Sequence, residues 1–305
     1  MTEKPATTAI VFSCDDAYVF LARGLVLSLA EAGYPDGDTK LILIDIGCGP
    51  EALSWMREHG VEIVPFDSAL IPQRIMAVIR PVQRAQVVRP WLPELLPRFE
   101  HFIWLDCDLW LQNGDVVKVL RAGANAVPDA VMLAPGNSHY NPTFYTDIEG
   151  LLNTQRGWYA SCYEPDFAKK AAMRLHYSSG VFGMRRASPI WALWRHEVES
   201  LYPLVAVRDG RLMHLAEQIA LNAVIIRTDL IVRLDPLYNF HCNEGGALRT
   251  QASGRVVTNM LLPSREIGVM HLANWSQIRQ HYVREKLLYR SGDYLSHAEW
   301  ASVAR

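Results

Sequence analysis

Residues 102–113 read FIWLDCDLWLQN and place two carboxylates, Asp106 and Asp108, at the end of an apolar run. Residues 102–105 combine β-branched and aromatic side chains as a buried strand does, and acidic residues are rare in such strands. The pattern therefore predicts a strand that ends at Asp106. Because residues i and i+2 of an extended segment point to the same side, both carboxylates can converge on one bound group. Two adjacent anions repel each other unless a cation lies between them, which indicates a divalent metal site.

The segments before this strand alternate between strand and helix patterns. Strands are expected at 7–13, 40–47 and 61–67, and helices at 17–33 and 50–60. This alternation predicts an α/β fold of the Rossmann-like kind, with a mostly parallel central sheet and helices on both faces. Ligands of such sheets bind beyond the carboxyl ends of the strands. Asp15, Asp106 and Asp108 are expected at that edge.

The second half of the chain begins with a change in amino-acid composition and periodicity. Residues 136–177 mix aromatic side chains with Asn, Pro, Gly and Ser and show little periodicity, which predicts a long, irregular and functional insertion. A strand is expected before it at 129–135. After it come the segment 176–184, helices expected at 187–202 and 214–225, a strand expected at 230–240, and the segment 266–275. The aromatic content of the insertion argues against disorder.

Composition sets the broad class of the protein. The chain has 305 residues, of which half are hydrophobic and a fifth are charged, and its formal net charge is −2. We expect one large α/β domain with no general attraction to nucleic acid. Five scattered cysteines form no CxxC pair and predict reduced thiols. Without a signal-peptide pattern or a stretch of membrane-spanning length, we expect a cytoplasmic protein, for which peripheral membrane contact stays open.

Five segments in this order resemble the retaining glycosyltransferases of family 8, which include glycogenin and bacterial lipopolysaccharide galactosyl- and glucosyltransferases. They are IVFSCDDAY (10–18), RPWLPELLP with FIWLDCDLWL (89–111), SSGVFGM (178–184), HLAEQIALNAVI (214–225) and VMHLANW (269–275). The resemblance implies a single GT-A domain over 1–305. It divides the domain into a nucleotide-sugar-binding half (8–135), an acceptor-loop insertion (136–177) and a catalytic and metal-binding half (178–290).

The resemblance also implies a ligand set for the metal. Asp106, Asp108 and His271 match the family's manganese ligands, and carboxylates with one imidazole suit Mn²⁺ better than Ca²⁺, with Mg²⁺ as the alternative. The metal would bridge the two phosphates of a nucleotide sugar and stabilise the departing diphosphate. Without the resemblance, a histidine such as His271 at the end of an apolar run is more often a core residue.

A second group of matched residues concerns the nucleoside. The resemblance assigns Asp15 to the edge of a uracil ring, and Ser13 and Cys107 to contacts with the nucleoside. A carboxylate that accepts from a ring N–H favours uracil over bases that present an acceptor there. Asp15 and Asp16 also have the position of a helix N-cap with an acidic first turn, and the two interpretations are compatible.

A third group concerns the sugar. Arg89 matches an arginine that the family uses near the sugar and diphosphate, although Arg84 is close enough to take the same role. Gln218 matches the residue beneath the anomeric carbon, and Glu217 the residue that binds sugar hydroxyls. The alternative for both is a polar helix face turned to solvent. Ser178 stands where the family has Asn, which shortens the reach to a sugar hydroxyl.

The last segment departs from the family. His271 and Asn274 keep the spacing of a His-x-x-Gly-x-x-Lys motif, but Gln277 stands in place of the lysine that meets the diphosphate. Arg279 is the first cation afterwards and is the candidate replacement, because a guanidinium binds two phosphate oxygens with a fixed fork.

The sequence thus predicts a metal-dependent hexosyltransferase that uses a UDP-sugar with retention of configuration. Its acceptor is expected to be a saccharide, glycolipid or polypeptide, held by aromatic residues of the insertion. These are Tyr140, Tyr145, Trp158 and Tyr159. Two alternatives remain open: a catalytically silent sugar-nucleotide-binding protein, and a phosphotransferase with Asp106 as nucleophile.

Overall fold

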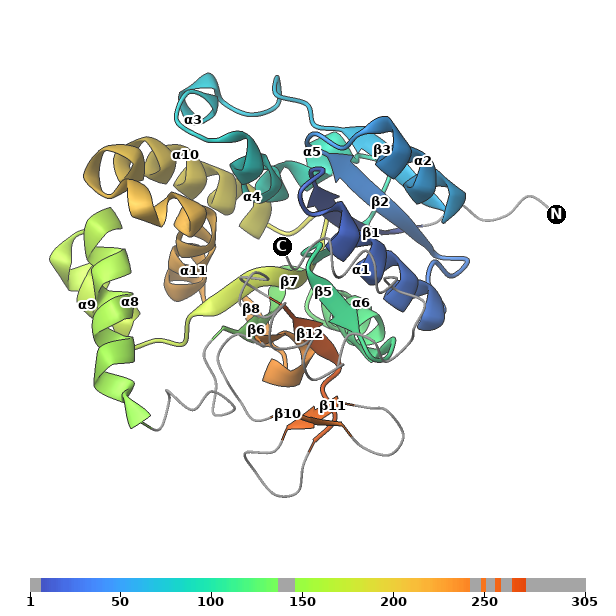
Figure 1. Cartoon of the computed structure of the whole chain (residues 1–305). Coiled ribbons are helices and arrows are strands. Elements are labelled where there is room, and N and C mark those ends of the chain that lie inside the picture. The colour runs from blue at the N-terminus through green and yellow to red at the C-terminus, as the bar shows by residue number, and fades with distance from the viewer. Residues whose placement is uncertain (1–6, 137–145, 242–247, 251–255, 259–264, 273–305) are drawn as a thin grey trace.

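The computed structural model describes residues 7–136, 146–241, 248–250, 256–258 and 265–272. A seven-stranded sheet forms its centre (Figure 1). In spatial order the strands are β3 (Val61–Pro65), β2 (Thr39–Asp45), β1 (Thr8–Cys14), β4 (His101–Leu105), β7 (Tyr177–Arg185), β6 (Val131–Pro135) and β8 (Ile231–Arg233). Only β7 runs against its neighbours, since its pairs with β4 and β6 are antiparallel. The predicted mostly parallel sheet is confirmed.

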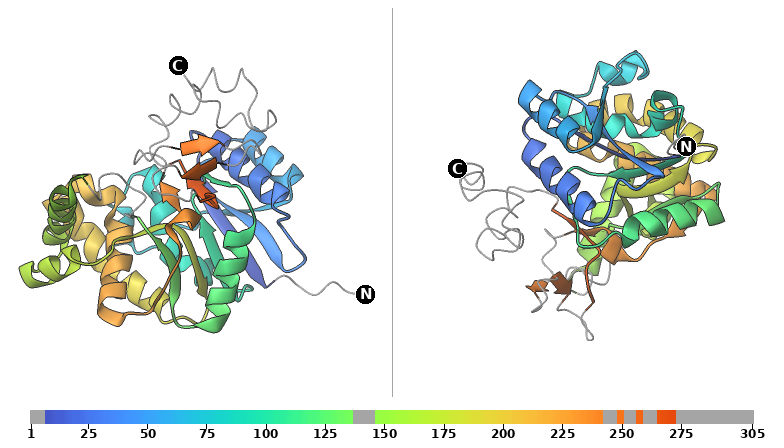
Figure 2. Two further views of the ribbon diagram at one scale, coloured as in Figure 1. Left: turned by 90° about the horizontal axis from the view of Figure 1, so that it is seen from below. Right: turned by 90° about the vertical axis from the view of Figure 1, so that its right-hand side faces the viewer.

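Helices cover both faces of the sheet (Figures 1 and 2). One face packs against α1 (Val19–Glu31), α2 (Pro50–Glu58) and α6 (Asp115–Ala126). The other packs against α10 (Ile190–Arg208), α11 (Ala216–Thr228) and the short helices α3 (Gln73–Met76), α4 (Arg84–Val87) and α5 (Leu92–Leu95). Successive side chains of β1 alternate between the two cores, with Val11 in one and Phe12 in the other, so the whole strand is apolar.

A second, three-stranded sheet lies beside the end of β4. It has the order β5 (Leu109–Leu111), β12 (Val269–His271) and β9 (Phe240–His241). The expected strand at 230–240 is therefore wrong in part: β8 ends at Arg233, and Pro236, which has no N–H for a strand ladder, begins a 3₁₀ turn (Pro236–Tyr238). A two-stranded ribbon joins β10 (Leu248–Thr250) to β11 (Val256–Thr258).

The expected irregularity of 136–177 is wrong for most of the segment. It forms α8 (Ile148–Cys162) and α9 (Pro165–Ala172), while 137–145 lies outside the described residues. The side chain of Asp147 accepts a hydrogen bond from the Gly150 backbone N–H and begins α8, and Pro165 occupies the first position of α9. None of the described helices is long and apolar enough to cross a membrane.

Candidate metal and nucleotide site

The two acids at the end of β4 meet a histidine from the far end of the chain. Asp106, Asp108 and His271 each offer a ligand atom, and these atoms all lie within 4.8 Å of one another. His271 Nε2 is 3.3 Å from an oxygen of Asp108 and 3.8 Å from Oδ2 of Asp106. The structure thus brings together the three residues that the sequence predicts as metal ligands.

Backbone pairing positions His271. Strand β12 pairs with β5 so that His271 lies opposite Leu109, and the Leu272 N–H donates to the Asp108 carbonyl at 3.0 Å. On the other side of the ring, His271 Nδ1 is 2.8 Å from Oδ1 of Asn239. Since an amide oxygen only accepts, Nδ1 carries the proton of the neutral ring and Nε2 faces the acids. Sequence analysis missed Asn239, because nothing local to residues 230–240 marks it.

The charges of this cluster favour a bound cation. Burial lowers the pKa of His271, but Asp108 and then Asp106 act in the opposite direction and raise it above its ordinary value. Burial raises the pKa of Asp108, and the facing His271 more than offsets this and lowers it. The cluster therefore stabilises positive charge between its members, and two carboxylates with one oriented imidazole fit a divalent metal.

The close approach of Gly180 to this cluster needs a glycine. A Cβ atom at Gly180 would lie 2.5 Å from His271 Cε1 and 2.8 Å from Oδ2 of Asp106. The Gly180 carbonyl also accepts from the Asp106 N–H at 2.8 Å, which fixes the backbone there. Strand β7 can therefore pass the ligands only without a side chain at this position.

We expect Gly180→Ala to weaken Mn²⁺ binding by about 10- to 100-fold, the usual effect of displacing metal ligands through their surroundings. Mn²⁺ titration followed by electron paramagnetic resonance measures this affinity. The control is Gly157→Ala in α8, where an added Cβ meets nothing within 4 Å among the described residues. Equal affinities of the Gly180→Ala variant and the wild type would contradict the proposed ligand cluster.

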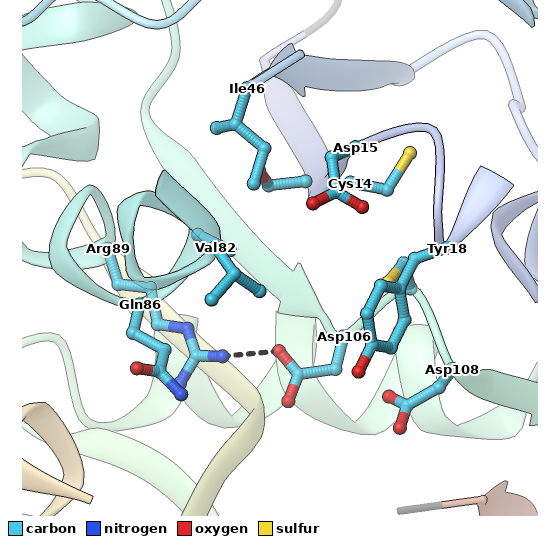
Figure 3. A pocket seen from close by; sticks show the side chains of 12 residues that line it. Cys14, Asp15, Tyr18, Ile46, Val82, Gln86, Arg89, Asp106 and Asp108 are labelled. Carbon is cyan, nitrogen blue, oxygen red and sulfur yellow. Dashed lines mark hydrogen bonds and ion pairs between the residues drawn. The ribbon is translucent and has the colours of Figure 1, made fainter. Parts of the chain in front are cut away.

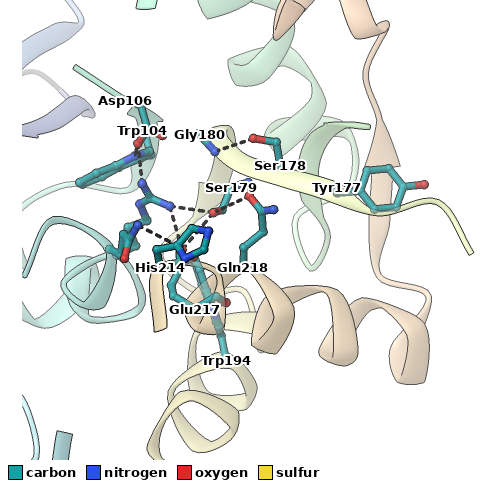
Figure 4. A network of polar contacts seen from close by, with 12 residues as sticks. Trp104, Asp106, Tyr177, Ser178, Ser179, Gly180, Trp194, His214, Glu217 and Gln218 are labelled. Atoms are coloured by element: carbon teal, nitrogen blue, oxygen red, sulfur yellow. Dashed lines mark hydrogen bonds and ion pairs between the residues drawn. The ribbon is translucent and has the colours of Figure 1, made fainter. Parts of the chain in front are cut away.

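Arg89 connects Asp106 of the metal cluster to Ser179 and Glu217, and these three partners are labelled in Figure 4. It is 6 % exposed, and one guanidinium nitrogen donates to Oδ1 of Asp106 at 2.5 Å. The other donates to Ser179 Oγ at 2.7 Å and to Oε2 of Glu217 at 2.8 Å. Trp104 Nε1 also donates to Oδ1 of Asp106, at 2.7 Å, so that Oδ2 is the oxygen turned toward the histidine.

The two candidate arginines have different surroundings, and Arg89 is the one that contacts Asp106. Arg84 lies over the ring of Phe66, with its guanidinium carbon 5.6 Å from the ring centroid, and none of the ion pairs of the described residues joins it to the acids. Ser179 is a second residue that sequence analysis missed. Its hydroxyl contacts Arg89 and Glu217, whereas the predicted Ser178 is buried and its hydroxyl accepts from the Gly180 N–H at 3.2 Å.

Glu217 does not lie on a solvated helix face. It is 2 % exposed, and burial raises the pKa of its carboxyl to about 7, although Arg89 and the Ser179 hydroxyl act in the opposite direction. The arginine charge is shared with Asp106, and Oε1 of Glu217 has no hydrogen-bond partner among the described residues. Gln218, the next residue, is half-buried.

The raised pKa of Glu217 predicts a pH-dependent stability. Between its ordinary pKa of 4.5 and about 7, the folded state holds a proton that the unfolded state has released, so the stability from Glu217 is lost as pH rises through 7. The Glu217→Gln variant lacks this loss. We expect its free energy of unfolding, relative to wild type, to rise by up to about 3 kcal/mol from pH 4.5 to pH 8. Urea unfolding at several pH values measures the difference, and a flat difference would contradict the buried proton.

A cleft opens beside the acids (Figure 3). Its lining includes all the residues predicted for the nucleoside together with two of the ligands, namely Ser13, Asp15, Cys107, Asp106 and Asp108. Asp15 accepts from the Ala17 N–H at 3.1 Å in the turn before α1. Burial raises the pKa of the Cys107 thiol, and Asp108 and Asp106 raise it further, which leaves a neutral thiol.

Several predicted residues cannot be placed in this way. Asn274, Gln277 and Arg279 lie outside the described residues, as do Tyr140 and Tyr145. Their roles stay predictions.

Of the aromatic side chains expected to stack on an acceptor, Tyr159 is 1 % exposed. That expectation is wrong for Tyr159, because a buried ring has no face for a sugar. Trp158 is half-buried, and its ring centroid is 5.2 Å from that of His176.

Comparison with known proteins rests on structure alone. No family model matches the chain, and a search of curated proteins found no match. The galactosyltransferase LgtC in complex with donor and acceptor sugar analogues is similar, with a TM-score of 0.58, 16 % identity, and coverage of 96 % of this chain and 99 % of that chain. The chain has a GT-A glycosyltransferase fold. The fold predicted from the sequence resemblance is thereby confirmed.

Two further glycosyltransferases share the GT-A fold with this chain. Xyloside xylosyltransferase 1 from mouse has a TM-score of 0.51 and 14 % identity, with coverage of 88 % of this chain and 98 % of that chain. The bifunctional glycosyltransferase WbbM has a TM-score of 0.56 and 12 % identity, with coverage of 89 % of this chain and 46 % of that chain. At these identities the likeness shows the fold alone.

Proposed function

We propose that the chain is a metal-dependent glycosyltransferase that moves a hexose from a UDP-sugar to a hydroxyl group, with retention of configuration. The observation that carries the proposal is the convergence of Asp106, Asp108 and His271 beside a cleft of a GT-A fold. The similar LgtC structure contains donor and acceptor sugar analogues, which supports a sugar-nucleotide donor and a saccharide acceptor here. A glycolipid or a polypeptide that offers a hydroxyl is the alternative acceptor.

The three ligands would hold Mn²⁺ or Mg²⁺, which supplies Lewis-acid stabilisation of the departing diphosphate. Arg89 and Trp104 fix one oxygen of Asp106 and turn the other toward His271. Asn239 fixes the tautomer of His271. The chain's own residues therefore orient the ligand atoms before any substrate arrives.

The cleft residues supply the remaining roles. Asp15 would accept from the uracil ring, with Ser13 and Cys107 beside the nucleoside. Gln218 would lie near the anomeric carbon, and Oε1 of Glu217 is an acceptor for a sugar hydroxyl. The other oxygen of Glu217 already accepts from Arg89 and Ser179, which disfavours it as a nucleophile. Retention then favours a front-side displacement in which the leaving diphosphate takes the proton of the acceptor hydroxyl.

The two alternatives predict different outcomes. In a phosphotransferase Asp106 would attack phosphorus, but Arg89 and Trp104 both donate to its Oδ1 and favour a fixed ligand instead. A silent binding protein would bind UDP-sugars without turnover.

The test is a panel of UDP-sugars with Mn²⁺, scored for UDP release in the absence of acceptor, with donor affinity measured in parallel. Release of UDP from at least one donor is expected. Binding without release over hours supports the silent protein, and release of inorganic phosphate from a phosphomonoester supports the phosphotransferase.

A further inference from the structure

A buried hydrogen-bond chain lies behind Gln218. Oε1 of its amide accepts from the Ser179 backbone N–H at 3.0 Å, and its Nε2 is 2.8 Å from Nε2 of His176. A backbone N–H can only donate, so the Ser179 contact fixes which end of the amide is the oxygen. Nε2 of Gln218 must therefore donate to Nε2 of His176.

This donor fixes the tautomer of His176. With a lone pair on Nε2, the neutral imidazole carries its proton on Nδ1, which lies 3.1 Å from the hydroxyl of Tyr159. His176 is 3 % exposed, and burial lowers its pKa to about 4, so the ring is neutral at neutral pH. Burial also raises the pKa of Tyr159, which keeps the phenol protonated. One arrangement of protons therefore satisfies the chain from Tyr159 to Ser179.

This series of hydrogen bonds connects α8 with the candidate site. Tyr159 lies on α8, His176 precedes β7, and Gln218 lies on α11. The hydroxyl of Ser179 continues the network to Arg89 and Glu217 (Figure 4). A Gln218 amide turned by 180° would oppose its NH₂ group to the Ser179 N–H and its oxygen to the lone pair of His176, which loses both hydrogen bonds.

We propose that His176, held by Tyr159, is a positioning residue that fixes the orientation of the Gln218 amide in the site. The effect of His176 on turnover rests on the proposed function, whereas the assignment of the His176 tautomer does not depend on it. Gln218 would touch the substrate, and His176 acts only through it.

The tautomer is tested by NMR of protein labelled with ¹⁵N in its 10 histidines. The signals of His176 are assigned with the His176→Gln variant. In the wild type at neutral pH, His176 is expected as the neutral Nδ1–H form. In Gln218→Glu, the new carboxylate needs a donor, so protonation at Nε2 of His176 is expected. An Nε2–H form in the wild type, or no change in Gln218→Glu, would overturn the inference.

Kinetics test the consequence for turnover. We expect His176→Phe, which keeps a ring without an acceptor, to lower kcat for UDP release by about 10- to 100-fold, because a misplaced group near the reacting atoms costs that much. The KM for the donor should change less than about threefold, since the cleft is intact. His176→Gln should restore most of kcat, because its amide oxygen can accept from Gln218.

Other outcomes are separable. An unchanged kcat in His176→Phe overturns the positioning role. If His176→Phe does not fold, kcat of the His176→Gln variant and the NMR comparison of the wild type with Gln218→Glu still test the orientation of the Gln218 amide. If the wild type releases UDP from no donor, the proposed function fails, while the NMR result still tests the orientation of Gln218.

Discussion

Asp108→Asn is expected to lower the rate of UDP release in Mn²⁺ by about 100-fold or more, because in the proposed reaction a divalent metal would contribute several kcal/mol to the stabilisation of the departing diphosphate. The substitution keeps the size of the side chain and removes one charged ligand that faces His271 at 3.3 Å. The fold should persist, since Asp108 lies in the short turn between β4 and β5. Steady-state kinetics and Mn²⁺ titration measure the two effects.

The matched control is Asp115→Asn. It removes the same charge from an exposed position in the first turn of α6, where Asp115 contacts only Lys118 among the ion pairs of the described residues. Its rate should stay within about twofold of wild type, as surface changes usually do. Equal rates for Asp108→Asn and Asp115→Asn would contradict a metal site at the acids.

At pH 8, above the pKa of about 7 of the Glu217 carboxyl, Arg89→Ala should destabilise the fold by about 3–5 kcal/mol, because it removes the partner of a buried carboxylate. Among the described residues, Oε2 of Glu217 would keep only the Ser179 hydroxyl, and Oδ1 of Asp106 would keep only Trp104. Urea unfolding measures the loss of stability. Where the variant folds, Mn²⁺ affinity should also fall, because Arg89 no longer orients Asp106.

Two further variants separate charge from packing. Arg84→Ala, whose guanidinium lies over Phe66 away from the acids, should cost no more than about 1 kcal/mol. Adding Glu217→Gln to Arg89→Ala should recover part of the lost stability, because the uncompensated charge is removed. A double variant that loses the sum of the two single effects would contradict the direct ion pair.

Much of the sheet could be predicted from the sequence, because each strand carries its own local signal. The run before Asp106 is apolar at every position, and it forms the strand β4 as expected; the structure places this strand at the centre of the sheet. Gly33 and Gly60 both have positive φ angles just after α1 and α2, where such residues commonly end helices. The position of the acids at the carboxyl edge followed from the fold class alone.

The rest depended on contacts between distant segments. Asn239 meets His271 only because β9 pairs with β12, and Arg89 meets Glu217 across 128 residues of chain. The polar residues around Glu217 left a solvent-exposed helix face as one alternative. In the structure Glu217 is buried, because the buried Arg89 donates a hydrogen bond to its carboxylate.

Helix α8 was missed for a similar reason. Its buried residues Gln155, Tyr159 and Cys162 have helical spacing, but a polar Gln begins the series and weakens the apolar pattern. Tyr159 was therefore expected on an accessible surface, whereas its ring is buried against His176.

The measurement that tests the central claim most directly is acceptor-free UDP release by the wild-type chain in Mn²⁺, in excess chelator, and after Mn²⁺ is added back. Asp106, Asp108 and His271 as ligands predict release in the first and third conditions and its loss in the second, because the charge of the leaving diphosphate is otherwise uncompensated. Release at an equal rate in excess chelator would contradict the claim.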